Sequence, residues 1–130
     1  MAQRLLLDTH AFLWWAMDHP RLSGAARAAI SQPDNECFLS TASTWELAIK
    51  ASLGKLEVAG DLQRFVRQQV TTNRFRLLTV ELSHSLRVAE LPWHHRDPFD
   101  RLLVAQCQVE SLTLLSADDS LRAYDLPVLW

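Results

Sequence analysis

The stretch RLLLDTH, residues 4–10, places an acidic side chain directly after a short apolar run. A run without polar alternation is typical of a central parallel strand that is covered on both faces. Acids recur at 43–47, 96–101 and 114–119, where further strands are expected to end and helices to begin. Since the turns that follow parallel strands gather at one edge of the sheet, where such folds bind ligands, we expect these acids to face one another.

The whole chain alternates strand-like and helix-like segments. Strands are expected at 4–8, 36–40, 75–80, 113–116 and 127–130. Helices are expected at 9–17, 24–30, 43–53, 61–72, 83–91, 98–110 and 118–124. This order predicts an α/β fold with a mostly parallel central sheet and helices on both faces. A length of 130 residues predicts a single domain, residues 1–130.

The composition limits the classes of protein to consider. The net charge of −2 excludes overall basicity as the means of holding nucleic acid, so a phosphate-binding surface must be local. Cys37 and Cys107 lie in apolar patterns without a CxxC motif, which predicts buried reduced thiols and a cytoplasmic protein. No signal peptide is visible, and no apolar stretch approaches the roughly 20 residues that span a bilayer, so we expect no membrane partner.

The acids themselves favour a metal site. Asp8 follows a buried strand, where a carboxylate without a partner would be costly. Asp100 lies in an apolar helical pattern, and Asp97 with Pro98 is placed to cap that helix, which leaves Asp100 free for another role. Crowded carboxylates repel and raise each other's pKa unless a cation neutralises them, and hard oxygen ligands suit Mg²⁺ or Mn²⁺.

Each acid also has a purely structural explanation, because acids favour the first turn of a helix. Ser43 and Glu46 have the spacing of a capping box, and Ser116 with Asp119 is a looser pair of the same kind. If Asp119 is a capping residue, Asp118 is the better candidate for the fourth acid of the site.

Four other side chains carry expectations. His95 is expected to orient the loop before Asp97 rather than to bind metal, because adjacent histidines rarely chelate one ion. Arg101 opposes the helix dipole, so it should either pair with Asp97 or contact a substrate phosphate. Trp14 and Trp15 are adjacent on one helix and cannot both face one core. One of them is therefore either exposed on a partner-binding surface or a partly covered ring, and the sequence favours neither.

Four segments together resemble a PIN domain of the VapC type, the ribonuclease toxins of bacterial toxin–antitoxin pairs. The matching segments are 6–10, 43–50 with 54–56, 95–106 and 115–118. The run DPFDRLLVAQ, residues 97–106, is the most specific of them. The resemblance covers essentially the whole chain and implies a three-layer α/β/α sandwich.

The resemblance further implies metal-dependent hydrolysis of RNA phosphodiester bonds, in a homodimer that a cognate antitoxin protein inhibits. The acids that it implies as catalytic residues and as ligands of one or two Mg²⁺ or Mn²⁺ ions are Asp8, Glu46, Asp100 and Asp118. The residues expected to contact the substrate are Thr9, Arg101 and Ser116. Ser116 stands where the family commonly has threonine, so the hydroxyl is kept. The first helix, with Phe12, Trp14 and Trp15, is expected to bind the antitoxin.

Other functions explain the sequence less well. A haloacid-dehalogenase-like phosphatase needs a second aspartate two positions after Asp8, and this chain has His10 there. A response-regulator receiver domain needs a lysine near its last strand, and no lysine follows Lys55. The main alternative is a catalytically inert PIN-like module that binds RNA or protein, although the four acidic positions are all filled.

Overall fold

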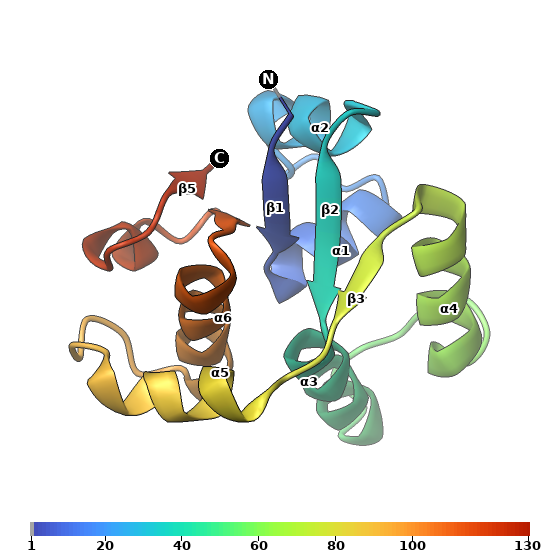
Figure 1. Ribbon diagram of the computed structural model, residues 1–130. Helices are drawn as coiled ribbons and strands as arrows, with labels where there is room; N and C mark the ends of the chain where they lie inside the picture. Colours follow the sequence, from blue (N-terminus) through green and yellow to red (C-terminus); the bar gives the residue numbers. More distant parts are fainter. Residues whose placement is uncertain (1) are drawn as a thin grey trace.

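The computed structural model describes residues 2–130, which form one parallel sheet with helices on both faces (Figure 1). The strands are β1 Arg4–Leu7, β2 Glu36–Ser40, β3 Arg76–Leu78, β4 Thr113–Leu115 and β5 Val128–Leu129. Their order in the sheet is β3-β2-β1-β4-β5, and each neighbouring pair is parallel. The apolar run that follows Gln3 therefore forms the central strand, as predicted.

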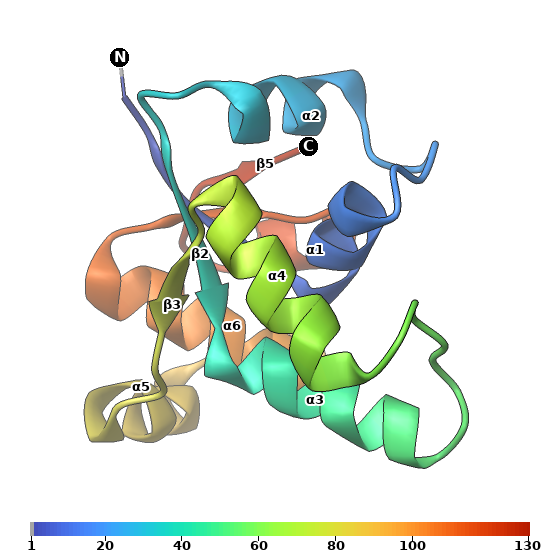
Figure 2. The ribbon, with the colours of Figure 1, turned by 90° about the vertical axis from the view of Figure 1, so that its right-hand side faces the viewer.

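The helices form two layers around this sheet. They are α1 Thr9–Ala16, α2 Gly24–Ser31, α3 Thr41–Ser52, α4 Leu62–Asn73, α5 Leu82–Arg87, α6 Pro98–Glu110 and the short 3₁₀ segments η1 Val88–Glu90 and η2 Asp119–Ala123. Helices α1, α2 and α4 cover one face, and α5 and α6 cover the other (Figure 2). Helix α3 continues from the carboxyl end of β2. The predicted three-layer α/β/α architecture is confirmed.

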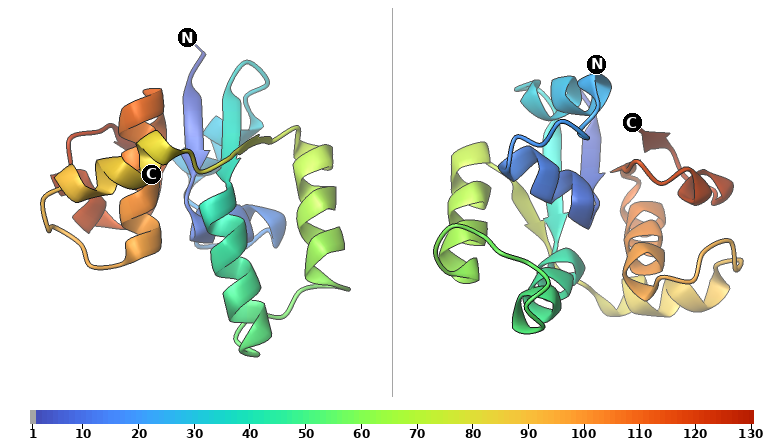
Figure 3. Two further views of the ribbon diagram at one scale, coloured as in Figure 1. Left: turned by 60° about the horizontal axis from the view of Figure 1, so that its bottom comes forward. Right: turned by 180° about the vertical axis from the view of Figure 1, so that it is seen from behind.

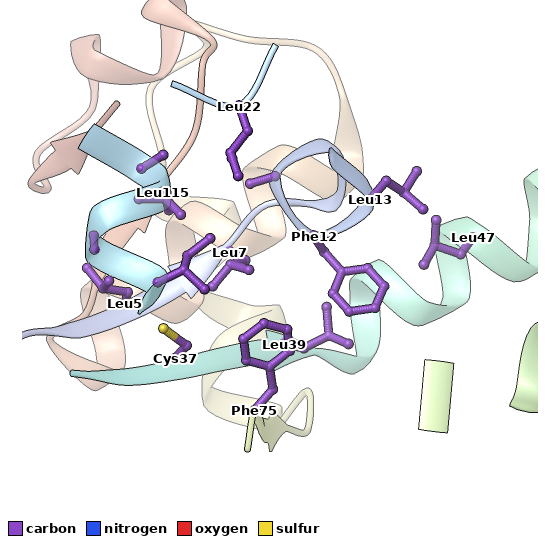
Figure 4. Packing of buried hydrophobic residues seen from close by; sticks show 14 residues of the cluster. Leu5, Leu7, Phe12, Leu13, Leu22, Cys37, Leu39, Leu47, Phe75 and Leu115 are labelled. Atoms are coloured by element: carbon purple, nitrogen blue, oxygen red, sulfur yellow. The ribbon is translucent and has the colours of Figure 1, made fainter. Parts of the chain in front are cut away.

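Consecutive leucines of β1 face opposite layers, which explains why the strand has no polar alternation. Leu5 and Leu7 pack with Phe12 and Phe75 in the cluster that Figure 4 shows. Leu6 points to the other face and packs in the cluster that includes residues 103–105 of α6. Each buried leucine contributes roughly 1.5–3 kcal/mol to folding, so this strand anchors both layers of the sandwich.

Helix caps set the positions of the first turns at the carboxyl edge. The Ala11 N–H donates to Oδ1 of Asp8 at 2.8 Å, and Asp97 caps α6 in the same way. Ser40 caps α3, and this helix begins at Thr41, two residues earlier than expected. The capping box that starts at Ser43 is therefore wrong, because Ser40 already caps the helix. Glu46 is consequently free for another role.

Both cysteines are buried and unpaired, as the sequence predicts. Burial raises the pKa of the Cys37 thiol to about 11 and raises that of Cys107 further, so both thiols stay protonated at neutral pH. Among residues 2–130, every helix is too short or too polar to cross a lipid bilayer.

Candidate metal centre

The acids from the four segments converge at the carboxyl edge of the sheet. The arrows of β1 and β2 point toward the end of the molecule where α3 and the first turn of α6 lie (Figures 1 and 3). The Asp8 N–H donates to the Leu115 carbonyl at 3.1 Å, which joins the ends of β1 and β4. The charges of Asp8 and Glu46 both act on Asp100. The predicted convergence of acids is therefore present in the fold.

Asp8 is the most deeply buried of these acids, with 5% of its surface exposed. Burial raises the pKa of its carboxyl above the usual range, while hydrogen bonds from the Ser116 hydroxyl and the Ala11 N–H act in the opposite direction. The nearby charge of Glu46 raises this pKa again. A carboxylate in this position is disfavoured unless positive charge is supplied.

The pKa of the Asp100 carboxyl is raised as well. Burial raises the pKa of its carboxyl to about 7, and the charges of Asp97, Asp8 and Glu46 add to the rise, while His95 lowers it. The side chain of Asp100 does not cap α6, because the carboxylate of Asp97 already accepts the backbone N–H groups of Phe99 and Asp100. The crowded acids therefore fit a divalent cation by their chemistry, since a bound cation would stabilise the ionised forms.

His95 connects Asp118 to Asp100. Its Nε2 lies 2.9 Å from Oδ2 of Asp118 and 3.5 Å from Oδ2 of Asp100, and one ligand atom from each residue lies within 4.8 Å of the others. The Asp97 N–H donates to Nδ1 at 3.0 Å, so in the neutral ring Nε2 carries the proton. The predicted role of His95 in orienting the Asp97 loop is confirmed. Its contact with the acids was not predicted.

Asp118 and Asp119 are clearly separated in the structure. Burial would raise the pKa of Asp118, but hydrogen bonds from Ser120 and His95 outweigh it and lower the pKa. Asp119 has 96% of its side chain exposed and pairs with Arg122. The structure therefore places Asp118 in the acidic cluster and Asp119 outside it.

Glu46 is held from both sides of its carboxylate. Oε1 lies 2.7 Å from the Thr9 hydroxyl, and Oε2 lies 3.1 Å from Nζ of Lys50. The Thr9 hydroxyl also lies 3.0 Å from that of Ser43, so α1 and α3 are joined at the site. Glu46 and Lys50 thus form an ion pair one helical turn apart on α3.

Comparison with known proteins identifies the family. The protein-family model described as "PIN domain" matches residues 5–126 of this chain. The chain belongs to the PIN-domain family. It is 30% identical over 124 residues to Ribonuclease VapC22 of Mycobacterium tuberculosis, covering 95% of this chain and 93% of the relative. The resemblance that the sequence motifs indicate is thus confirmed.

Solved structures support the fold independently. A chain of VapBC2 from Rickettsia felis, bound to a DNA fragment, matches with a TM-score of 0.76 at 14% identity and covers 98% of both chains. A toxin–antitoxin complex from Klebsiella pneumoniae matches with a TM-score of 0.66 at 16% identity, covering 97% of this chain and 96% of the other. At these identities the likeness shows a shared fold.

The PIN domain buries the three residues expected to contact substrate. Thr9 and Ser116 lie behind the acids, where Thr9 contacts Glu46 and Ser116 hydrogen-bonds Asp8. Both hydroxyls are covered and already engaged by acids of the site, and their contact with substrate stays a prediction. Their role in the structure is to position carboxylates.

Arg101 is also turned into the PIN domain, with 3% of its surface exposed. Its guanidinium donates to backbone carbonyls of segment 88–92 at 2.8–3.5 Å and to the Tyr124 hydroxyl at 3.1 Å. The expected ion pair with Asp97 is therefore wrong, and the contact with a substrate phosphate stays a prediction. The hydrogen bonds to backbone explain how a cation is tolerated in the first turn of α6.

The aromatic side chains of α1 form part of the PIN-domain interior. Phe12 is fully buried, Trp14 packs against Trp130, and Nε1 of Trp15 donates to Asn73 at 3.0 Å. Both tryptophans are half-buried by segments that are distant in sequence, so of the two alternatives the partly covered ring is confirmed and the fully exposed one is wrong.

Proposed function

We propose that this PIN domain, taken as a single domain over residues 1–130, is a ribonuclease that hydrolyses RNA phosphodiester bonds and is the toxin of a toxin–antitoxin pair. The observation that carries the proposal is the convergence of acids from four segments on one edge of the sheet. The 30% identity to Ribonuclease VapC22 along nearly the whole chain supports the same reaction and substrate class.

The acids proposed to hold Mg²⁺ or Mn²⁺ and to act as the catalytic residues are Asp8, Glu46, Asp100 and Asp118. Such an ion, when bound, acidifies water and stabilises the negative charge that develops on a phosphate. The raised pKa values of Asp8 and Asp100 support this assignment, because a cation favours the ionised forms that burial and mutual repulsion oppose.

The chain's own residues hold the carboxylates in place. Asp97 fixes the first turn of α6, so the backbone of Asp100 is held at the edge of the cluster. Thr9 and Lys50 each engage one oxygen of Glu46, which leaves little freedom for that side chain to rotate. Preorganised ligands of this kind lower the cost of assembling the site when substrate arrives.

We also propose a cognate antitoxin protein and a homodimer, in the cytoplasm. A ribonuclease that attacks cellular RNA needs an inhibitor. The structural neighbour from Klebsiella pneumoniae is a toxin–antitoxin complex, and the one from Rickettsia felis is VapBC2 bound to DNA. The alternative, an inert RNA- or protein-binding module, is less well supported because every acid of the cluster is present and positioned.

The test is cleavage of a single-stranded RNA by the purified chain, freed of any co-purifying inhibitor. We expect cleavage with Mg²⁺ or Mn²⁺, and loss of cleavage in Asp8→Asn and Asp100→Asn, which keep the shape of the side chain and remove its charge. Asp119→Asn is the matched control, since this acid lies outside the cluster, and it should cleave normally. Undiminished cleavage in excess EDTA would contradict the proposal.

A further inference from the structure

Two tryptophans next to the acidic cluster are largely exposed. Trp93 has 79% and Trp45 has 61% of its surface accessible. The proposed hydrolysis uses neither side chain, and leaving an apolar ring in water forgoes the free energy that its burial would contribute. Exposed rings beside a reaction site are candidates for contact with substrate.

One face of the Trp93 ring packs against a cation. The ring lies 3.8 Å from the guanidinium carbon of Arg101, which is fixed by hydrogen bonds to backbone and to Tyr124. One face of the indole therefore rests on a rigid group, while most of the ring is open to solvent. Trp93 is two residues before His95, which contacts Asp100 and Asp118, and its ring packs on the residue that follows Asp100.

Trp45 is the second exposed ring, and it stands on α3 rather than in the segment before α6. It precedes Glu46 on α3, and its ring meets Phe99 edge-on, with centroids 5.3 Å apart at 69°. Phe99 in turn precedes Asp100 on α6. The aromatic pair thus spans the two helices that supply Glu46 and Asp100, and it holds the exposed indole at the edge of the cluster.

We propose that Trp45 and Trp93 stack unpaired RNA bases on the two sides of the scissile phosphate, an inference that rests on the proposed ribonuclease function. Stacking on aromatic rings requires bases that are not paired, and it tolerates any base because each has a π-face. The two residues therefore bind single-stranded segments in preference to duplex.

The charges around Trp93 favour RNA over a protein partner. Arg96 is exposed, and among residues 2–130 it has no carboxylate within ion-pair distance. A free guanidinium three residues from an open indole suits a phosphate next to a stacked base. This is the local basic group that a chain with a net charge of −2 requires for RNA binding.

The experiment measures binding of a fluorescein-labelled single-stranded RNA by anisotropy. The full chain carries Asp100→Asn to prevent cleavage, and Trp45 and Trp93 are each changed to Leu or to Phe. We expect each Leu variant to weaken binding by about 5- to 150-fold and each Phe variant to retain most of the affinity. Leu53→Ala, which alters an equally exposed apolar residue on the C-cap of α3, should bind like the parent.

Two further arms separate the outcomes. A fully paired duplex should bind weakly and be insensitive to the Trp variants. In chains that keep Asp100, Trp93→Leu should raise KM for RNA with kcat nearly unchanged, and thermal melting checks that the fold is intact.

If the Leu variants bind single-stranded RNA as tightly as the parent, the stacking proposal is wrong. This holds even if the same variants lose self-association or antitoxin binding, because the tryptophans would then serve a protein interface. If the unmodified chain cleaves RNA while the Trp variants match it, only the stacking proposal fails. If the unmodified chain with metal neither binds nor cleaves RNA, the proposed function fails as well.

Discussion

The imidazole of His95 donates from Nε2 to Oδ2 of Asp118 over 2.9 Å, and so holds an acid that otherwise lies on a short turn at the surface. The same nitrogen is 3.5 Å from Asp100. The ring thus bridges two acids that stand on different elements, α6 and the turn after β4.

This bridge predicts that His95→Ala weakens binding of Mn²⁺ by about 10- to 100-fold, the usual effect of removing a group that orients metal ligands. His94→Ala is the matched control, because its ring packs edge-on against Tyr124 and makes no contact with the acids. Isothermal titration calorimetry with Mn²⁺ measures both. Unchanged affinity in His95→Ala would show that Asp118 needs no support, and complete loss would identify His95 as a direct ligand.

Asp97 and Asp100 are three residues apart but have opposite expected effects on stability. Asp97→Ala removes the cap that accepts the N–H groups of Phe99 and Asp100, and should lower the free energy of unfolding by about 0.5–2 kcal/mol. Asp100→Ala removes a crowded carboxyl, and should leave the metal-free protein equally stable or more stable while abolishing cleavage. Chemical denaturation in EDTA measures both variants. A large loss of stability in Asp100→Ala alone would reverse the two roles.

The raised pKa of Asp100 predicts how the stability of the metal-free protein depends on pH. Burial and neighbouring charges raise this pKa from 3.8 to about 7, so the folded state binds the proton more tightly than the unfolded chain. The stabilisation from this proton is complete below about pH 4 and is lost as the pH rises through about 7.

The comparison is melting temperature in EDTA for the parent and Asp100→Asn. The melting temperature of Asp100→Asn should exceed that of the parent by an amount that increases between pH 4 and pH 8, because the amide cannot ionise. Parallel curves would contradict the raised pKa. Addition of Mn²⁺ at the upper end of the range should restore the stability of the parent and leave that of the variant largely unchanged.

The architecture could be predicted because local signals agreed with one another. The unbroken apolar run of residues 5–7 marked a strand buried on both faces, and Asp97 with Pro98 marked the start of α6. The convergence of acids that follow separate strands could also be predicted, because the turns after parallel strands share one edge of the sheet. These inferences need only local sequence patterns and the general topology of a parallel sheet.

Side-chain roles that depend on distant segments could not be predicted in this way. Arg101 is satisfied by carbonyls of segment 88–92, whose arrangement follows from the packing of the α5 region against α6. Trp14 is covered by Trp130, more than a hundred positions away in the chain. The spacing of Ser43 and Glu46 suggested a cap, but β2 ends at Ser40, which caps α3 instead.

The last prediction concerns Thr9, which the fold places behind Glu46. Thr9→Val keeps the shape of this buried side chain and removes the hydroxyl that contacts Oε1, so Glu46 loses one of its two fixed contacts. We expect kcat for RNA cleavage to fall while KM stays close to that of the parent, since no contact with RNA is removed.

Thr9→Ser, which keeps the hydroxyl, should retain most of the activity and serves as the matched control. Melting curves of both variants separate an effect on the site from an effect on folding. A rise in KM with unchanged kcat in Thr9→Val would show instead that this hydroxyl binds substrate. A fall in kcat that Thr9→Ser restores would place the residue among those that position the acids.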